Sequence, residues 1–135
     1  MFRYQTTIHL FDTDATGVLY FAHQFRLALE ALEHALKSLG YTLARALEEA
    51  NCYMPIVNAT ADYYSPLVVG DAIVVVLKVE KRGTSSFTLR GDFFLQGNLV
   101  GRTSIVHVTV DRETRKAIPI PPLITGFLQE LERGE

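Results

Sequence analysis

Residues 22–40, AHQFRLALEALEHALKSLG, decide the fold because they form a long segment with the periodicity of a helix. Apolar side chains return along it at spacings of three and four residues, which places them on one stripe of a helix. That stripe consists of Phe25, Leu29, Leu32, Leu36 and Leu39. Gly40 stands just past the last of these residues, where a helix commonly ends. The segment therefore predicts one long helix with a strongly apolar face.

The chain on either side of this helix has the patterns of strands and turns. Upstream, residues 4–11 alternate between two faces, which is typical of a strand. The turn-forming residues 12–17 then separate this strand from the helix. Downstream, Thr42 is positioned to cap a second, short helix at residues 43–50.

After Pro55 the sequence changes to β character. Four strands are predicted, at residues 56–64, 72–81, 86–96 and 99–110. Gly97 and Asn98 form the two-residue connection of a tight hairpin between the last two strands. The proline-rich residues 119–122 end the sheet, because proline cannot donate to a ladder. A closing helix is expected from about residue 123 to residue 131.

The order of these elements predicts the α+β class, in which helices cover one face of an antiparallel sheet. One helix with such a strong apolar stripe indicates that the sheet curls around it. No internal repeat, low-complexity tract or linker indicates a second domain. Residues 1–135 are therefore expected to form a single domain.

Composition and charge argue against several classes of function. The formal net charge of −2 offers no general attraction to nucleic acid. No apolar run approaches the roughly 20 residues that span a bilayer, and no cleavable signal peptide is visible, so no membrane association is expected. Cys52 is a lone cysteine, which fits neither an intrachain disulfide nor a structural zinc site. A cytoplasmic protein without bound metal is the expectation.

The residues with chemical potential lie between the first strand and the long helix, in the segment DTDATGVLYF at positions 12–21. A helix start offers unpaired backbone N–H groups and a partial positive charge, which polarise a carbonyl and hold an oxyanion. A carboxylate beside it, from Asp12 or Asp14, can attack that carbonyl or deprotonate water. Gly17 permits a positive φ angle or a close backbone approach. The same aspartates are also common as turn and cap residues, and spacing alone does not decide between the two roles.

The run DTDATGVLYFA at residues 12–22 resembles the hallmark segment of the 4-hydroxybenzoyl-CoA thioesterase family, a branch of the hotdog-fold thioesterases. Two further matches follow in the expected order. Residues 61–66, ADYYSP, followed by Gly70 and Asp71, resemble the family's strand and turn after the helix, and residues 82–87, RGTSSF, resemble its next hairpin. The resemblance implies a curved antiparallel sheet wrapped around one long central helix. It also implies an acyl-CoA thioesterase activity.

The resemblance further implies roles for individual residues. Asp14 matches the family's catalytic aspartate, acting as nucleophile or general base, while Asp12 supports the loop. The backbone N–H of Phe21 matches the group that polarises the thioester carbonyl, and Tyr20 shapes the acyl pocket. The hairpin that resembles the family's CoA-contacting region holds Lys81, Arg82, Thr84 and Ser85. A solvated turn explains this hairpin equally well.

The family also indicates which molecules the chain meets. Coenzyme A enters as part of the substrate, so no separate cofactor is expected. Family members join their sheets edge to edge, with the acyl site at the subunit interface, which implies a homo-oligomer, either a dimer or a tetramer. The sequence leaves open the roles of His23 and Glu30, and it does not show which basic residues hold the CoA phosphates.

Two features narrow the acyl group. The branch linked to the Tol-Pal envelope system has a histidine directly after the hallmark tyrosine, whereas this chain has Phe21 there. The segment looks closest to the 1,4-dihydroxy-2-naphthoyl-CoA hydrolases of phylloquinone and menaquinone synthesis. Three further aromatic residues, Tyr53, Tyr63 and Tyr64, are candidates to line a slot for such a flat ring, although ordinary core packing is the more common role of each. The alternatives are a short-chain or other aryl-CoA thioesterase, a hotdog dehydratase, and a non-catalytic acyl-CoA-binding protein.

Overall fold

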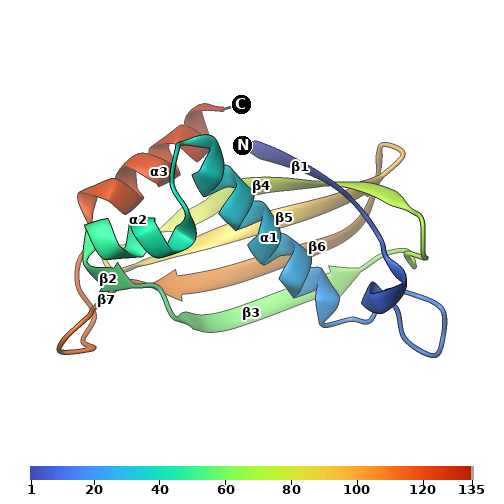
Figure 1. Cartoon of the computed structure of the whole chain (residues 1–135), viewed down its shortest axis with the longest axis horizontal. Helices are drawn as coiled ribbons and strands as arrows, with labels where there is room; N and C mark the ends of the chain where they lie inside the picture. Colours follow the sequence, from blue (N-terminus) through green and yellow to red (C-terminus); the bar gives the residue numbers. More distant parts are fainter. Residues whose placement is uncertain (135) are drawn as a thin grey trace.

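A five-stranded sheet and one long helix dominate the computed structural model, which describes residues 1–134 (Figure 1). The strands are antiparallel to their neighbours and follow the order β1-β4-β5-β6-β3. Their bounds are Phe2–Thr7 (β1), Ile56–Tyr63 (β3), Ala72–Arg82 (β4), Ser86–Leu95 (β5) and Asn98–Val108 (β6). Helix α1, His23–Ser38, crosses one face of this sheet. The predicted α+β class, with a sheet curved around one long helix, is confirmed.

The smaller elements gather at one end of the sheet, opposite the loop that precedes α1 (Figure 1). They are the helices α2, Leu43–Ala50, and α3, Pro122–Arg133, and a two-stranded sheet of β2, Cys52–Tyr53, with β7, Val110–Asp111. The predicted cap of α2 is present, since Thr42 Oγ1 accepts the Arg45 N–H at 3.1 Å. No helix within residues 1–134 is long and apolar enough to cross a membrane.

The buried face of α1 combines three small residues with larger apolar ones. Ala28, Ala31 and Ala35 are all buried there. An added Cβ at Gly91 of β5 would lie 3.6 Å from the Cβ of Ala28, an ordinary contact, but only 2.8 Å from Thr103 Oγ1. Gly91 is therefore required by the side chain on the neighbouring strand, within a closely packed layer beneath α1.

The buried face of α1 differs from the predicted stripe. Leu32 and Leu36 are buried as expected, but Leu39 is 42% exposed. The two other predicted members, which are only half-buried, are Phe25 and Leu29. The buried face is turned toward the alanines and includes Gln24 and Leu27. The prediction followed the largest apolar side chains, whereas the close approach to the sheet selected smaller ones.

Two other boundaries differ from the predictions, each of them at a turn. The first strand ends at Thr7 rather than at residue 11, because Leu10–Asp12 form a 3-10 helix, η1. The hairpin between β5 and β6 turns at Gln96 and Gly97, with φ angles of 50° and 80°, and not at Gly97 and Asn98. A tight type I′ turn needs positive φ at both central residues, so this pair fixes the register of the two strands.

Candidate active site

The loop between η1 and α1 is a narrow hairpin. At its base the Tyr20 N–H donates to the Asp12 carbonyl at 2.9 Å, and further out the Asp14 N–H donates to the Val18 carbonyl at 3.2 Å. The Gly17 N–H closes the tip by donating to the Asp14 carbonyl at 3.0 Å. Gly17 has a φ of +82°, a conformation that strains any residue with a Cβ. Gly17 therefore adopts the positive φ angle that was expected as one of its two possible roles.

This hairpin is attached to the segment that follows β3. The Leu19 N–H donates to the Leu67 carbonyl at 2.7 Å, and Val18 pairs with Val68 in an isolated bridge. Leu19 and Leu67 are both buried. The loop is thus fixed to the body of the protein through its second half, immediately before α1 begins.

The carboxylate of Asp14 is exposed and bound to its own loop. Its Oδ1 accepts the Thr16 N–H at 2.8 Å and the Thr16 hydroxyl at 2.5 Å. These bonds hold the pKa of the Asp14 carboxyl below its ordinary value, and the hydroxyl contributes most. Asp14 is therefore both a turn residue, as the simpler interpretation had it, and an ionised carboxylate available to solvent.

The backbone before α1 is arranged as the start of a helix. α1 begins at His23, so Phe21 lies two residues before it, in the tight turn that leads into it. The His23 N–H donates to the Tyr20 carbonyl at 2.9 Å, and the Gln24 N–H donates to the Phe21 carbonyl at 3.3 Å. The Tyr63 hydroxyl also donates to the Phe21 carbonyl, at 2.6 Å. The peptide after Phe21 is thus held from the helix and from the end of β3.

A cleft of about 270 Å³ opens beside this helix start. Its lining residues come from the hairpin, the first turn of α1 and the end of β3: Val18, Leu19, Gln24, Tyr63, Tyr64, Ser65, Pro66 and Leu67. Of the three aromatic residues predicted for a flat slot, Tyr63 and Tyr64 are therefore present. Tyr53 is not, because it pairs with Val110 in the small sheet of β2 and β7. For Tyr53 the alternative of ordinary packing therefore holds, and its place in that sheet depends on a pairing that local sequence does not reveal.

Gln24 is a site residue that the sequence analysis missed. Its side chain is only 2% exposed, and its Nε2 donates to the carbonyl oxygens of Asp62 and Arg102 at 3.0 and 3.3 Å. An added Cβ at Gly101 would lie 2.8 Å from the Gln24 Oε1, so that glycine makes room for the amide. The sequence did contain a signal for its role, because Gln24 is a polar residue on the same helical face as Leu27 and the alanines.

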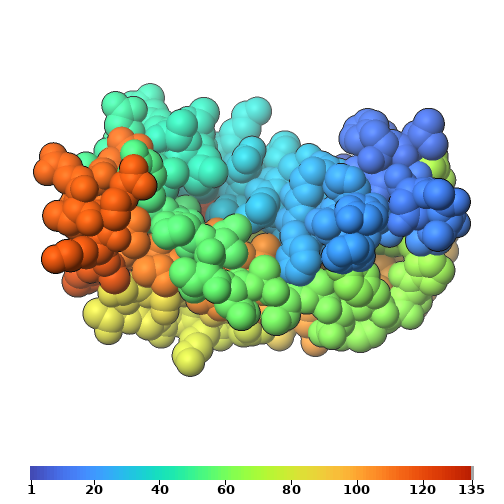
Figure 2. Space-filling view, turned by 90° about the horizontal axis from the view of Figure 1, so that it is seen from below, coloured from blue at the N-terminus to red at the C-terminus, as the bar shows by residue number. Residues whose placement is uncertain are grey.

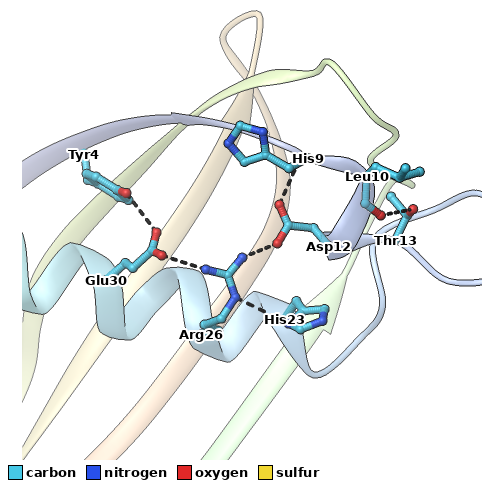
Figure 3. A network of polar contacts seen from close by, with 8 residues as sticks. All are labelled: Tyr4, His9, Leu10, Asp12, Thr13, His23, Arg26 and Glu30. Carbon is cyan, nitrogen blue, oxygen red and sulfur yellow. Dashed lines mark hydrogen bonds and ion pairs between the residues drawn. The ribbon is translucent and has the colours of Figure 1, made fainter.

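A chain of polar contacts lies on the other side of the hairpin base (Figure 3). The Asp12 side chain is fully buried, pairs with Arg26 and accepts the His9 N–H at 2.8 Å. Arg26 also pairs with Glu30, whose second oxygen accepts the Tyr4 hydroxyl at 2.8 Å. Asp12 therefore supports the loop, as expected, and Glu30 belongs to the same network.

The predicted CoA-contacting hairpin lies at the far end of the sheet from Asp14. Ala72, at the start of β4, pairs with Thr7 near the loop, and Arg82 ends the same strand ten residues later. Strand geometry makes this separation roughly 30 Å. Lys81, Arg82 and Thr84 are exposed, Ser85 is half-buried, and Arg82 pairs with Glu132 of α3 at 3.3 Å. Within one subunit, this hairpin and the carboxylate of Asp14 do not meet.

Residues 8–128 match the thioesterase-like superfamily. The chain belongs to this superfamily. Its fold is the hotdog fold, and a 1,4-dihydroxy-2-naphthoyl-CoA thioesterase from Synechocystis superposes on it with a TM-score of 0.88 at 26% identity, over 96% of each chain. A gentisyl-coenzyme A thioesterase superposes with a TM-score of 0.80 at 25% identity, over 91% of this chain and 98% of its own. The thioester hydrolase activity expected from the sequence is confirmed.

Sequence relatives cover nearly the whole of this thioesterase. A protein of Prochlorococcus marinus strain NATL2A, named 1,4-dihydroxy-2-naphthoyl-CoA hydrolase, is 34% identical over 92% of this chain and 84% of its own length. A protein of Microcystis aeruginosa with the same name is 32% identical over 96% of both chains. No group of three or more metal-binding side chains (His, Cys, Asp or Glu) converges in the described part of the thioesterase.

Replacing Thr16 with valine tests the local control of Asp14. The variant loses the hydroxyl and keeps the N–H donor, so the pKa of Asp14 is expected to rise toward its ordinary value without reaching it. The measurement is an NMR titration of the Asp14 carboxyl carbon. Thr13→Val is the matched control, because that hydroxyl donates to the Leu10 carbonyl at 2.7 Å instead. An unchanged pKa of Asp14 in Thr16→Val would contradict the assignment.

Proposed function

We propose that this thioesterase hydrolyses an aromatic CoA thioester, 1,4-dihydroxy-2-naphthoyl-CoA, in the synthesis of phylloquinone or menaquinone. The observation that carries the proposal is the similarity, over nearly the full chain, to proteins that bear this name, at 31 to 34% identity in three cases. The cleft beside the helix start supports it. Two tyrosines line that cleft, and aromatic faces stack on a flat ring.

Asp14 and the helix start supply the chemistry. The substrate carbonyl would accept the Phe21 N–H, which places the partial positive end of α1 against the oxygen that gains charge in the transition state. The Asp14 carboxylate, which Thr16 orients through two hydrogen bonds, then attacks the carbonyl carbon or deprotonates a water that does so. In the first case the C–S bond breaks to release the CoA thiolate, and water hydrolyses the resulting anhydride. In the second case the deprotonated water adds to the carbonyl carbon, and the C–S bond breaks to release the CoA thiolate.

A second copy of the chain would complete the site. β3 is an edge strand that pairs only with β6 in the sheet, and every residue of it is exposed except Ala61, which is half-buried. Figure 2 shows β3, in green, uncovered along the face seen from below. Exposed apolar side chains continue along it at Ile56, Val57 and Tyr63. An exposed edge of this length is suited to pair with another sheet, which would bring the partner's β3 beside the cleft.

Another aryl-CoA ester is the second candidate substrate, because a gentisyl-coenzyme A thioesterase also superposes on this chain. A thiol-release assay with purified protein distinguishes the candidates. The highest kcat/KM is expected for the bicyclic naphthoyl ester, followed by single-ring aryl esters and then by short aliphatic esters. A preference for gentisyl-CoA or for a short aliphatic ester would overturn the substrate assignment without affecting the role of Asp14.

Asp14→Asn tests that role. Turnover of the naphthoyl ester is expected to fall by about 100- to 10,000-fold, the usual contribution of a positioned acid–base group, while binding of the ester persists. Asp111→Asn is the matched control. Like Asp14, Asp111 accepts two hydrogen bonds from its own turn, here from the N–H groups of Glu113 and Thr114, but it lies at the other end of the sheet (Figure 1). Parental turnover in Asp14→Asn would remove the proposed mechanism.

Ala59→Lys tests the pairing through β3. Like charges brought together at the subunit contact should convert an oligomer into smaller species in sedimentation velocity, with loss of activity. Gln5→Lys is the control, since Gln5 is exposed on β1, at the opposite edge of the sheet. A monomeric and fully active parent would contradict the proposed pairing.

A further inference from the structure

The guanidinium of Arg26 reaches three groups from the second turn of α1 (Figure 3). Its Nη2 pairs with Asp12 Oδ1, its Nη1 with Glu30 Oε1 at 2.6 Å, and its Nε donates to His23 Nδ1 at 3.4 Å. The planar fork of arginine suits it to hold two carboxylates at fixed positions, which the single ammonium of lysine does not do. Arg26 thus connects α1 to the base of the loop that bears Asp14.

Burial of the Asp12 side chain makes its ion pair with Arg26 necessary. The side chain is fully buried, and its two oxygens are taken by Arg26 and by the His9 N–H. Its carbonyl accepts the Tyr20 N–H at the base of the hairpin. A buried carboxylate requires a paired charge, so the position of Asp12 follows that of Arg26.

The two groups proposed for catalysis are close to Asp12 along the chain. Asp14 follows it by two residues, and Phe21 follows Tyr20, the residue paired with Asp12, by one. Phe21 is also held by the Tyr63 hydroxyl and by the Gln24 N–H, so a movement of Asp12 would shift the Asp14 carboxylate relative to the Phe21 N–H. Glu30 pairs with the same guanidinium and accepts a hydrogen bond from the Tyr4 hydroxyl of β1.

An exposed pair elsewhere in the chain shows what a simple helix ion pair looks like. Arg45 and Glu49 on α2 have the same spacing of four residues, with side chains 69% and 41% exposed. Their contact joins two residues of one helix. The contact of Arg26 with Glu30 has this spacing too, but the same guanidinium extends to a buried carboxylate on a different element.

We propose that Arg26 is a positioning residue of this thioesterase, whose pairing with Asp12 and Glu30 sets the geometry between the Asp14 carboxylate and the Phe21 N–H. The inference rests on the proposed role of Asp14. Arg26 itself does not react with the substrate. Its loss lowers the rate of the chemical step and leaves substrate binding largely intact.

The test compares Arg26→Gln, Arg26→Lys and Glu30→Gln with the parent in a steady-state thiol-release assay. For Arg26→Gln, kcat should fall by about 100-fold, the effect expected of a misplacement near 1 Å, with KM changed by less than about 3-fold. Arg26→Lys should recover part of kcat because it keeps the charge opposite Asp12. Glu30→Gln should lower kcat less, since the contact with Asp12 remains. Arg45→Gln is the matched control and should retain the parental kcat and KM.

A double variant separates positioning from stability. Asp12→Asn combined with Arg26→Gln removes the buried charge as well as its partner, so the melting temperature should recover relative to Arg26→Gln. The kcat should remain low, because the neutral pair does not restore the fork geometry. Recovery of kcat together with the melting temperature would overturn the inference and assign Arg26 a structural role alone.

The remaining outcomes are also decisive. If Arg26→Gln does not fold, Arg26→Lys and Glu30→Gln carry the test, and parental kcat in both would overturn the inference. Parental kcat in a folded Arg26→Gln would do the same. Should Asp14→Asn be inactive while Arg26→Gln is fully active, only the positioning role fails. Should Asp14→Asn retain parental turnover, the catalytic proposal fails and the positioning role fails with it.

Discussion

The carboxylate of Asp12 has no exposed surface, and a buried charge is stable only when other groups pair with it. Arg26 and the His9 N–H meet that requirement, one from α1 and the other from the residue that precedes η1. The loop can therefore occupy one position between these elements. A turn that is otherwise largely exposed thereby gains a fixed base, on which the exposed carboxylate of Asp14 is carried.

The attachment of α1 to the sheet is the second constraint. Three alanines lie on the buried face of the helix, and Gly101 on β6 leaves room for the Gln24 amide. The amide in turn donates to backbone carbonyls of β3 and β6. The start of α1 is thus attached to the end of the sheet where the cleft opens, beside Tyr63.

Local sequence was sufficient wherever short-range physics determines the outcome. Thr42 capped α2 as predicted, and the long helix, the later strands and the hallmark loop were found in place. The buried face of α1 was misjudged, because the side of the helix that faces the sheet depends on tertiary packing and not on side-chain size alone. The end of the first strand at Thr7 was missed because η1 depends on the buried contact of Asp12.

Roles that depend on distant pairing were the least accessible from sequence. Tyr53 was one candidate for the acyl slot, and its pairing with Val110 places it instead in the small sheet at the other end. The network of Arg26 was not foreseen either, since Asp12, Arg26 and Tyr4 come from three elements. The family resemblance identified the loop and the activity, whereas the side chains that fix the loop became visible only in the structure.

In the proposed mechanism, the start of α1 binds the acyl carbonyl of the substrate and Asp14 attacks it. A crystal structure with a CoA ketone analogue, in which a methylene group replaces the thioester sulfur, tests this most directly. If the Phe21 N–H binds the carbonyl, the ketone oxygen should lie about 3 Å from the Phe21 nitrogen. The mechanism also predicts a carboxylate oxygen of Asp14, or a water bound to it, at about 3 to 3.5 Å from the ketone carbon. A ketone bound away from the start of α1, with Asp14 of neither subunit near its carbon, would contradict it.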